Sequence, residues 1–394
     1  MTGPALTADA VGVRASYFYL SYAHSPPLAG AREASHDRWV RAFYTDLTAA
    51  VRRHAPQRRS HMVTGFYDQE IPLDSNWKAL LIRALSAAEV FVPLYSEGYF
   101  TRSWPGREWA CFQQRLTDAE VSDPLSRVIP VLWVPLPPGR TPPALDRALA
   151  LGAGDQVYLD NGLAAMLRLT PYRARYDAIV ERLAEEIVDL AETSTLAPSP
   201  VPDIDDVPSA FSPSESTALL AVAVLAPAGT AWRPFREQQL SLADYAATIG
   251  EQLDFAVLIT DIGKASRKFE HNPAVLLIDP ALVADGRTQR TLRELAGKLP
   301  AWVVPAIVLD ATSVDRVTED VRTVRAILES TSYPRTEPVR RALRGIGSLA
   351  DFVALMPFLI AEAERQYLRH GPIERTVAPP GSRPRLSDGE GDTR

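Results

Sequence analysis

The chain has 394 residues, 46% of them hydrophobic and 23% charged, a composition typical of globular proteins with a buried core and unlike that of a wholly disordered chain. Its 42 basic and 48 acidic residues give a net charge of −6, which excludes the chain-wide basic surface that binds nucleic acid non-specifically. The single cysteine, Cys111, excludes an intrachain disulfide and suits a reducing compartment. Because no charged leader precedes an apolar run and no stretch approaches about 18 apolar residues, we expect a cytoplasmic protein without a membrane segment.

Short apolar runs alternate with amphipathic helical patterns in the first half of the chain. Strands are predicted over residues 17–21, 62–67, 90–95 and 128–134, and helices over 39–51, 77–88 and 172–190. Pro171 favours a helix start, because the N–H that proline lacks would be unpaired in the first turn anyway. The alternation predicts a parallel sheet with helices on both faces, and therefore an α/β fold.

Prolines predict where the chain divides. Residues 193–213 contain five prolines and three aspartates without a helical or strand period, so we expect an extended, solvated linker there. The linker separates a first domain, residues 14–192, from a second domain, residues 214–370. Residues 371–394 have the composition of a disordered tail.

The second half repeats the alternation of strands and helices. Strands over 219–225, 255–260, 275–279 and 303–310, with helices over 235–251, 288–298, 315–330 and 348–367, predict a second α/β domain. Asp261, Asp279 and Asp310 each end an apolar run, so they either form a site at one edge of the sheet or form turns. The six histidines are not spaced like metal ligands, so we expect no metal site.

Four segments of the first half follow one another in an informative order. They are FYLSYAH at 18–24, HDRWVRAFYTDL at 36–47, GFYDQEIPLDSNWKALLIRALSAAEVFVPLYS at 65–96 and YFTRSWPGREW at 99–109. In this order the sequence resembles a TIR domain over about residues 14–192, which implies a flavodoxin-like parallel sheet. Asp37 matches the acidic position after the first segment, although an insertion precedes it, and Pro105 replaces a common cysteine.

The resemblance also implies a set of site residues. In TIR domains that hydrolyse NAD the catalytic residue is a glutamate four positions after a tryptophan, which places this role on Glu108. The residues expected to bind NAD lie at strand ends or are aromatic: Ser21, Tyr22, Tyr67, Asp68, Trp77, Ser96 and Trp104. A fixed carboxylate suits this chemistry, because cleavage of the bond between nicotinamide and ribose develops positive charge on the sugar. The alternative is a solvated Glu108 near a helix start that Ser103 caps.

Two functions follow from the resemblance. TIR domains act in signalling by self-association or by binding another protein, here through residues 68–76, and some hydrolyse NAD as a substrate without a required cofactor. The pairing of a TIR-like half with a second α/β half is similar to the TIR-like FxsC proteins of actinobacteria, which accompany radical-SAM modification systems for FxSxx-COOH peptides. That similarity implies a protein partner in a peptide-modification system.

Signalling and NAD hydrolysis both stand as hypotheses for the function of this protein. Neither a nucleic acid nor a membrane is expected as a partner.

Overall fold

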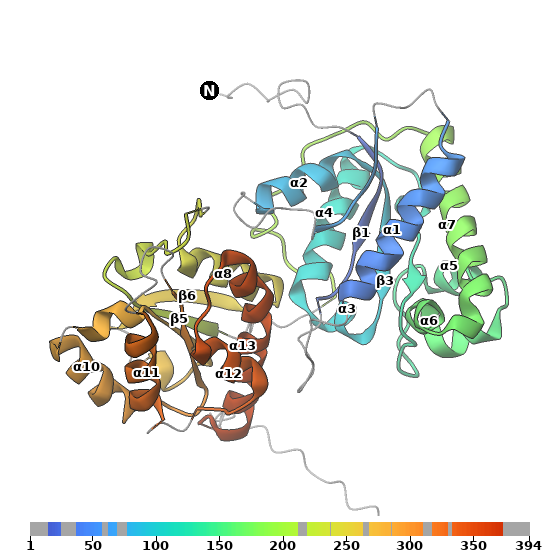
Figure 1. Cartoon of the computed structure of the whole chain (residues 1–394). Coiled ribbons are helices and arrows are strands. Elements are labelled where there is room, and N and C mark those ends of the chain that lie inside the picture. Colours follow the sequence, from blue (N-terminus) through green and yellow to red (C-terminus); the bar gives the residue numbers. More distant parts are fainter. Residues whose placement is uncertain are drawn as a thin grey trace, which may run out of the picture.

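The computed structural model describes residues 15–24, 37–56, 62–68, 77–211, 219–236, 238–262, 268–284, 286–309, 317–329 and 333–372. These residues form an α/β structure with two four-stranded sheets, one in each half of the chain (Figure 1). The predicted α/β class is therefore confirmed. Within the described ranges, no helix is both long enough and apolar enough to cross a lipid bilayer.

The N-terminal sheet has four parallel strands. They are β1 (Ser16–Ser21), β2 (Val63–Phe66), β3 (Ala88–Tyr95) and β4 (Val131–Leu132), in the spatial order β2-β1-β3-β4. This order is compatible with a flavodoxin-like sheet. The fourth strand is shorter than the predicted 128–134, because Pro130 has no N–H to donate to the ladder and interrupts the pairing after Val128.

Helices cover both faces of this sheet. One face packs against α1 (Asp37–His54), α6 (Gln156–Arg168) and α7 (Arg173–Thr193), and the other against α2 (Trp77–Ala87) and α4 (Ser103–Asp118) (Figure 1). Two short helices, α3 (Glu97–Thr101) and α5 (Leu145–Ala150), complete this half. Side chains alternate along β1, so Phe18 and Leu20 join the core of the first face while Tyr19 joins that of the second. The chain thereby points Tyr19 and Ser21 toward α4.

The C-terminal sheet repeats the strand order. Its strands are β5 (Leu219–Leu225), β6 (Ala256–Asp261), β7 (Ala274–Ile278) and β8 (Val303–Ile307), parallel and in the order β6-β5-β7-β8. Its helices are α8 (Leu242–Gln252), α10 (Gly286–Ala296), α11 (Val317–Leu328), α12 (Glu337–Arg344) and α13 (Leu349–His370). Helix α8 begins later than the predicted residue 235, because Ser241 and Asp244 form a capping box that fixes the start.

Residues 194–211, which we call the strap, pack against the N-terminal half. Leu196 and Ile204 are only 5% and 0% exposed, and they join the core between the sheet and helices α2 and α4. The fully buried Arg115 donates hydrogen bonds to the carbonyls of Leu196 and Ala197. Most residues of the strap are exposed, as expected of a linker, but the segment is held to the first half because its apolar residues cover a helix surface.

Candidate functional site

Glu108 lies on α4 and is only 3% exposed, so the interpretation of this residue as a solvated surface glutamate is wrong. Its Oε1 accepts a hydrogen bond from the Tyr19 hydroxyl at 2.8 Å, and its Oε2 accepts one from Ser21 Oγ at 2.5 Å. Ser21 is the last residue of β1, so the carboxyl group sits at the carboxyl edge of the sheet. Ligands enter open parallel sheets at this edge.

The environment of Glu108 favours its neutral form. The pKa of its carboxyl group is raised to about 8, mainly by burial and to a smaller extent by the nearby negative charge of Asp68. Hydrogen bonds from Ser21 and Tyr19, and the proximity of His24, act in the opposite direction. At pH 7 the carboxyl group is therefore mostly protonated, and it loses its proton as the pH rises through about 8. Carboxyl groups with raised pKa values at a sheet edge are typical of functional sites.

Two tyrosines complete the hydrogen-bond network. The Tyr99 hydroxyl lies 3.0 Å from Ser21 Oγ, so Ser21 joins Tyr99 to Glu108. Burial raises the pKa of Tyr19 and that of Tyr99 well above the usual value near 10. Both phenols therefore stay protonated, and Tyr19 remains a donor to Glu108 across the physiological pH range.

A second polar pair lies beside the first. His24 Nε2 lies 2.6 Å from Asp68 Oδ2, and His24 Nδ1 lies 3.3 Å from the Tyr22 hydroxyl. Asp68 is 6% exposed, and its Oδ1 has no hydrogen-bond partner among the described residues. A buried carboxylate oxygen in that state is an acceptor available to a ligand. Our sequence reading missed His24, although its position three residues after Ser21, just past the end of β1, could have revealed it.

The predicted aromatic residues fall into two groups. The rings of Tyr22 and Tyr67 are 5.7 Å apart, beside the His24–Asp68 pair. Trp77 of α2 and Trp104 of α4 form a separate pair with ring centroids 4.9 Å apart. Trp104 lies one helical turn before Glu108. Ser96 caps α3, where its Oγ accepts a hydrogen bond from the Tyr99 N–H.

Ser103 does not cap α4 as the sequence suggests. It is the first residue of the helix, and its own N–H donates to Asp254 Oδ2 at 3.0 Å. Asp254 belongs to the C-terminal half and lies 151 residues further along the chain. The expectation of a local cap is wrong because the cap comes from a distant segment.

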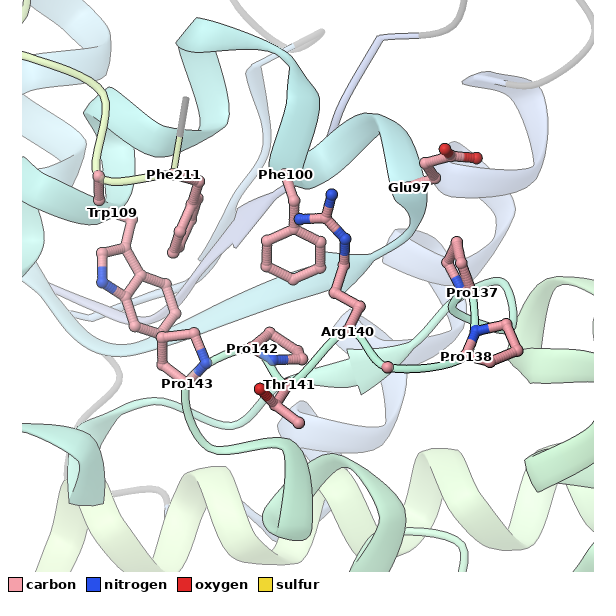
Figure 2. A pocket seen from close by; sticks show the side chains of 12 residues that line it. Glu97, Phe100, Trp109, Pro137, Pro138, Arg140, Thr141, Pro142, Pro143 and Phe211 are labelled. Atoms are coloured by element: carbon pink, nitrogen blue, oxygen red, sulfur yellow. The ribbon is translucent and has the colours of Figure 1, made fainter. Parts of the chain in front are cut away.

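A pocket of about 790 Å³ opens beside helices α3 and α4 (Figure 2). Its walls include Glu97, Phe100, Trp109, Arg140 and four prolines between residues 137 and 143, together with Phe211 of the strap. The Arg140 guanidinium lies 5.5 Å from the centre of the Phe100 ring. The ring centroids of Tyr99 and Phe211 are 5.9 Å apart, so Tyr99 links the Glu108 network to one wall residue of the pocket.

The described residues contain no cluster of three or more histidine, cysteine, aspartate or glutamate side chains suited to a metal ion. Comparison with known protein families finds no family that matches the chain, and comparison with curated proteins finds no match either. A function must therefore be argued from the arrangement itself. That arrangement is a buried carboxyl group held by two hydroxyls, a neighbouring carboxylate with an available oxygen, and an aromatic pocket nearby.

Proposed function

We propose that this protein hydrolyses the N-glycosidic bond of NAD, with Glu108 as the catalytic carboxylate of a TIR-like N-terminal half. The observation that carries the proposal is the burial of Glu108 at the carboxyl edge of the sheet, with one oxygen bonded to Tyr19 and the other to Ser21. In the reaction, the bond between ribose C1′ and the nicotinamide nitrogen breaks, and its electron pair leaves with neutral nicotinamide. Water then forms a bond to C1′ and releases a proton.

Glu108 acts in its ionised form. Positive charge develops on the ribose in the transition state, and a fixed carboxylate stabilises that charge most strongly where water is excluded. Tyr19 and Ser21 keep the carboxylate in one orientation through their hydrogen bonds. Since nicotinamide leaves as a neutral molecule, no general acid is needed.

Asp68 has the role of binding the ribose. Its available Oδ1 accepts a hydrogen bond from a sugar hydroxyl, while the bond between Oδ2 and His24 fixes the carboxylate. His24 is therefore a positioning residue for Asp68. The aromatic pocket receives the adenylate half of the substrate, because rings stack on a purine and a guanidinium binds phosphate.

Self-association is part of the proposal. A carboxyl group that is 3% exposed cannot touch a substrate until neighbouring segments rearrange, and the TIR resemblance implies that assembly supplies this rearrangement. The loop that the sequence assigns to self-association, residues 68–76, lies outside the described residues from residue 69 onward. The FxsC resemblance alone carries the proposal of a partner in a peptide-modification system.

The test is nicotinamide release from NAD by the full chain over a range of protein concentrations and crowding conditions. We expect specific activity to rise with protein concentration and to be lost in Glu108→Gln. The matched control is Glu185→Gln, an exposed glutamate on α7, the helix on the other face of the sheet. Absence of release from the wild type under all conditions would remove the proposed activity, and equal release from wild type and Glu108→Gln would remove the role of Glu108.

A further inference from the structure

The helix that carries Glu108 is capped by the other half of the chain. Helix α4 begins at Ser103, and the residue before it, Arg102, provides no side-chain cap. The carboxylate of Asp254 takes that place: Oδ2 accepts from the Ser103 N–H at 3.0 Å, and Oδ1 accepts from the Ser103 hydroxyl. Asp254 therefore pairs an N–H that would otherwise lack an intrahelical partner, and its negative charge stabilises the positive end of the helix.

Asp254 holds this position with an unusual backbone. Its φ of 71° lies in the left-handed region, which glycine and, less often, asparagine or aspartate adopt. The residue forms the turn between α8 and β6, where the Phe255 N–H donates to the Gly250 carbonyl at 3.0 Å. Glycine would satisfy this turn equally well. The aspartate side chain is explained by its contact with α4.

Other contacts join the same two regions. Arg102 Nη1 donates to the Leu253 carbonyl at 2.7 Å, and Lys78 Nζ of α2 lies 3.2 Å from Glu251. The strap secures the next turn of α4, because the Ala210 N–H donates to the Gly106 carbonyl at 3.1 Å. The first two turns of α4 are thus held by the C-terminal half and by the strap.

We propose that Asp254 is a positioning residue for Glu108, through which the C-terminal half controls the proposed active site. This inference rests on the proposed NAD hydrolysis. Glu108 lies five residues after Ser103, in the second turn of the capped helix. Loss of the cap frays the first turn, separates Trp104 from Trp77 and admits water to the carboxyl group. Any partner or event that pulls the two halves apart therefore disables the site.

Two substitutions distinguish the role of Asp254 as the cap of α4 from its role in the turn between α8 and β6. Asp254→Gly keeps the left-handed backbone but removes the carboxylate, whereas Asp254→Asn tolerates the same backbone and keeps an acceptor oxygen for the Ser103 N–H. A helix cap contributes about 1 kcal/mol, which corresponds to roughly a fivefold change in an equilibrium. In Asp254→Gly we expect hydrogen exchange in the first turns of α4 to accelerate about fivefold. We expect kcat for nicotinamide release to fall by a similar factor when it is measured above pH 8, where Glu108 is ionised in both proteins. Asp254→Asn should stay close to wild type in both.

Measurement of the Glu108 pKa in Asp254→Gly distinguishes a positioning role of Asp254 from a general loss of stability. If the cap keeps water from Glu108, its pKa should fall from about 8 toward 4.5 in Asp254→Gly, measured by the pH profile of kcat or by an NMR titration of the side-chain carboxyl carbon. An unchanged pKa, or faster exchange at α4 with unchanged kcat, would overturn the proposal. The NMR titration and the exchange measurement need no turnover, so they test the positioning role even if NAD is not a substrate.

Discussion

The two sheets of this protein share one strand order but differ in what lies at their carboxyl edges. At the N-terminal sheet, Ser21, Asp68 and Glu108 are buried and bonded to other side chains. At the C-terminal sheet, Asp261 accepts from the Thr230 N–H at 3.2 Å, and Asp279 accepts from the Ala281 N–H at 2.9 Å. The contact of Asp279 with an N–H two residues ahead favours the interpretation of this residue as turn-forming. Asp261 instead accepts from an N–H 31 residues earlier in the chain and lines a pocket of about 560 Å³, while Asp310 lies outside the described residues.

The comparison teaches that topology alone does not create a site. Both sheets offer the same edge to a ligand, yet among the residues that the structure describes only the N-terminal edge combines buried hydroxyls with a carboxyl group of raised pKa. The C-terminal half instead contributes through its contact with α4. One half therefore carries the proposed chemistry, and the other fixes the helix that presents it.

The largest effect is expected when one carboxylate at the edge of each sheet is replaced and the two variants are compared. Glu108→Gln should lower nicotinamide release by at least about 100-fold, the usual cost of removing one electrostatic contact to a transition state. Asp279→Asn should leave release unchanged, because its carboxylate binds a local backbone N–H. The measurement is the initial rate at saturating NAD. Comparable losses in both variants would mean that the two edges do not differ in function.

The pH dependence of stability gives the next largest effect. The pKa of Glu108 is raised to about 8 in the folded protein from about 4.5, so between these values the unfolded chain has lost a proton that the folded chain keeps. Stability from this group is therefore complete below about pH 4.5 and is lost as pH rises through about 8. Relative to Glu108→Gln, wild type should lose on the order of a few kcal/mol of unfolding free energy across this range.

Urea unfolding at several pH values checks this result. The groups facing Glu108 that also affect its charge are Asp68, His24, Tyr19 and Ser21. Since only the ionised form is proposed to act, nicotinamide release should rise with pH up to about 8 while stability declines. A stability difference that does not vary with pH would contradict the buried, neutral carboxyl group.

Substitution of Gly106 tests how closely the strap packs on α4, and substitution of Gly286 in the C-terminal half is the control. A Cβ at Gly106 would lie 2.0 Å from Ser209 Oγ and 3.1 Å from the Ala210 nitrogen, whereas a Cβ at Gly286 meets nothing within 4 Å. Gly106→Ala should therefore lower the free energy of unfolding by about 1–3 kcal/mol, as overpacking does. Gly286→Ala should leave it within about 0.5 kcal/mol of wild type. Chemical denaturation followed by tryptophan fluorescence measures both.

The smallest expected effect concerns the aromatic pocket. Arg140→Gln removes the guanidinium proposed to bind phosphate, so KM for NAD should rise about tenfold while kcat stays unchanged. Nicotinamide mononucleotide lacks the adenylate half, and its KM should not change. An equal increase for both substrates would place the effect of Arg140 outside the pocket.

Strands were the easiest elements to predict, because each is a short apolar run with polar residues at its ends. β1, β2, β3 and β5 lie within two residues of the predicted ranges. The start of α8 was predicted too early because the apolar residues Phe235 and Leu240 precede the capping box at Ser241, where the helix begins. The prolines of the strap predict its exposed, extended course but not the apolar residues that pack on α2 and α4.

The candidate site was only partly visible in the sequence. The resemblance to TIR domains placed Glu108, Ser21 and Asp68, but nothing in the local pattern indicated that Glu108 would be buried. His24 does not stand out in the sequence, because its spacing from the other histidines is not that of metal ligands. The contact between Ser103 and Asp254 spans 151 residues and depends on how the halves meet, which periodicity and propensity do not encode.

Arg115 has a consequence for how the chain can be divided. Its guanidinium is fully buried, and its Nη atoms donate to the carbonyls of Leu85 and Ala88 on one side and of Leu196 and Ala197 on the other. A fragment that ends at residue 192 would leave half of these donors without their partners and uncover the apolar surface under Leu196 and Ile204. The shortest fragment suited to expression of the N-terminal half therefore ends after residue 211, and the strap is an integral part of that half.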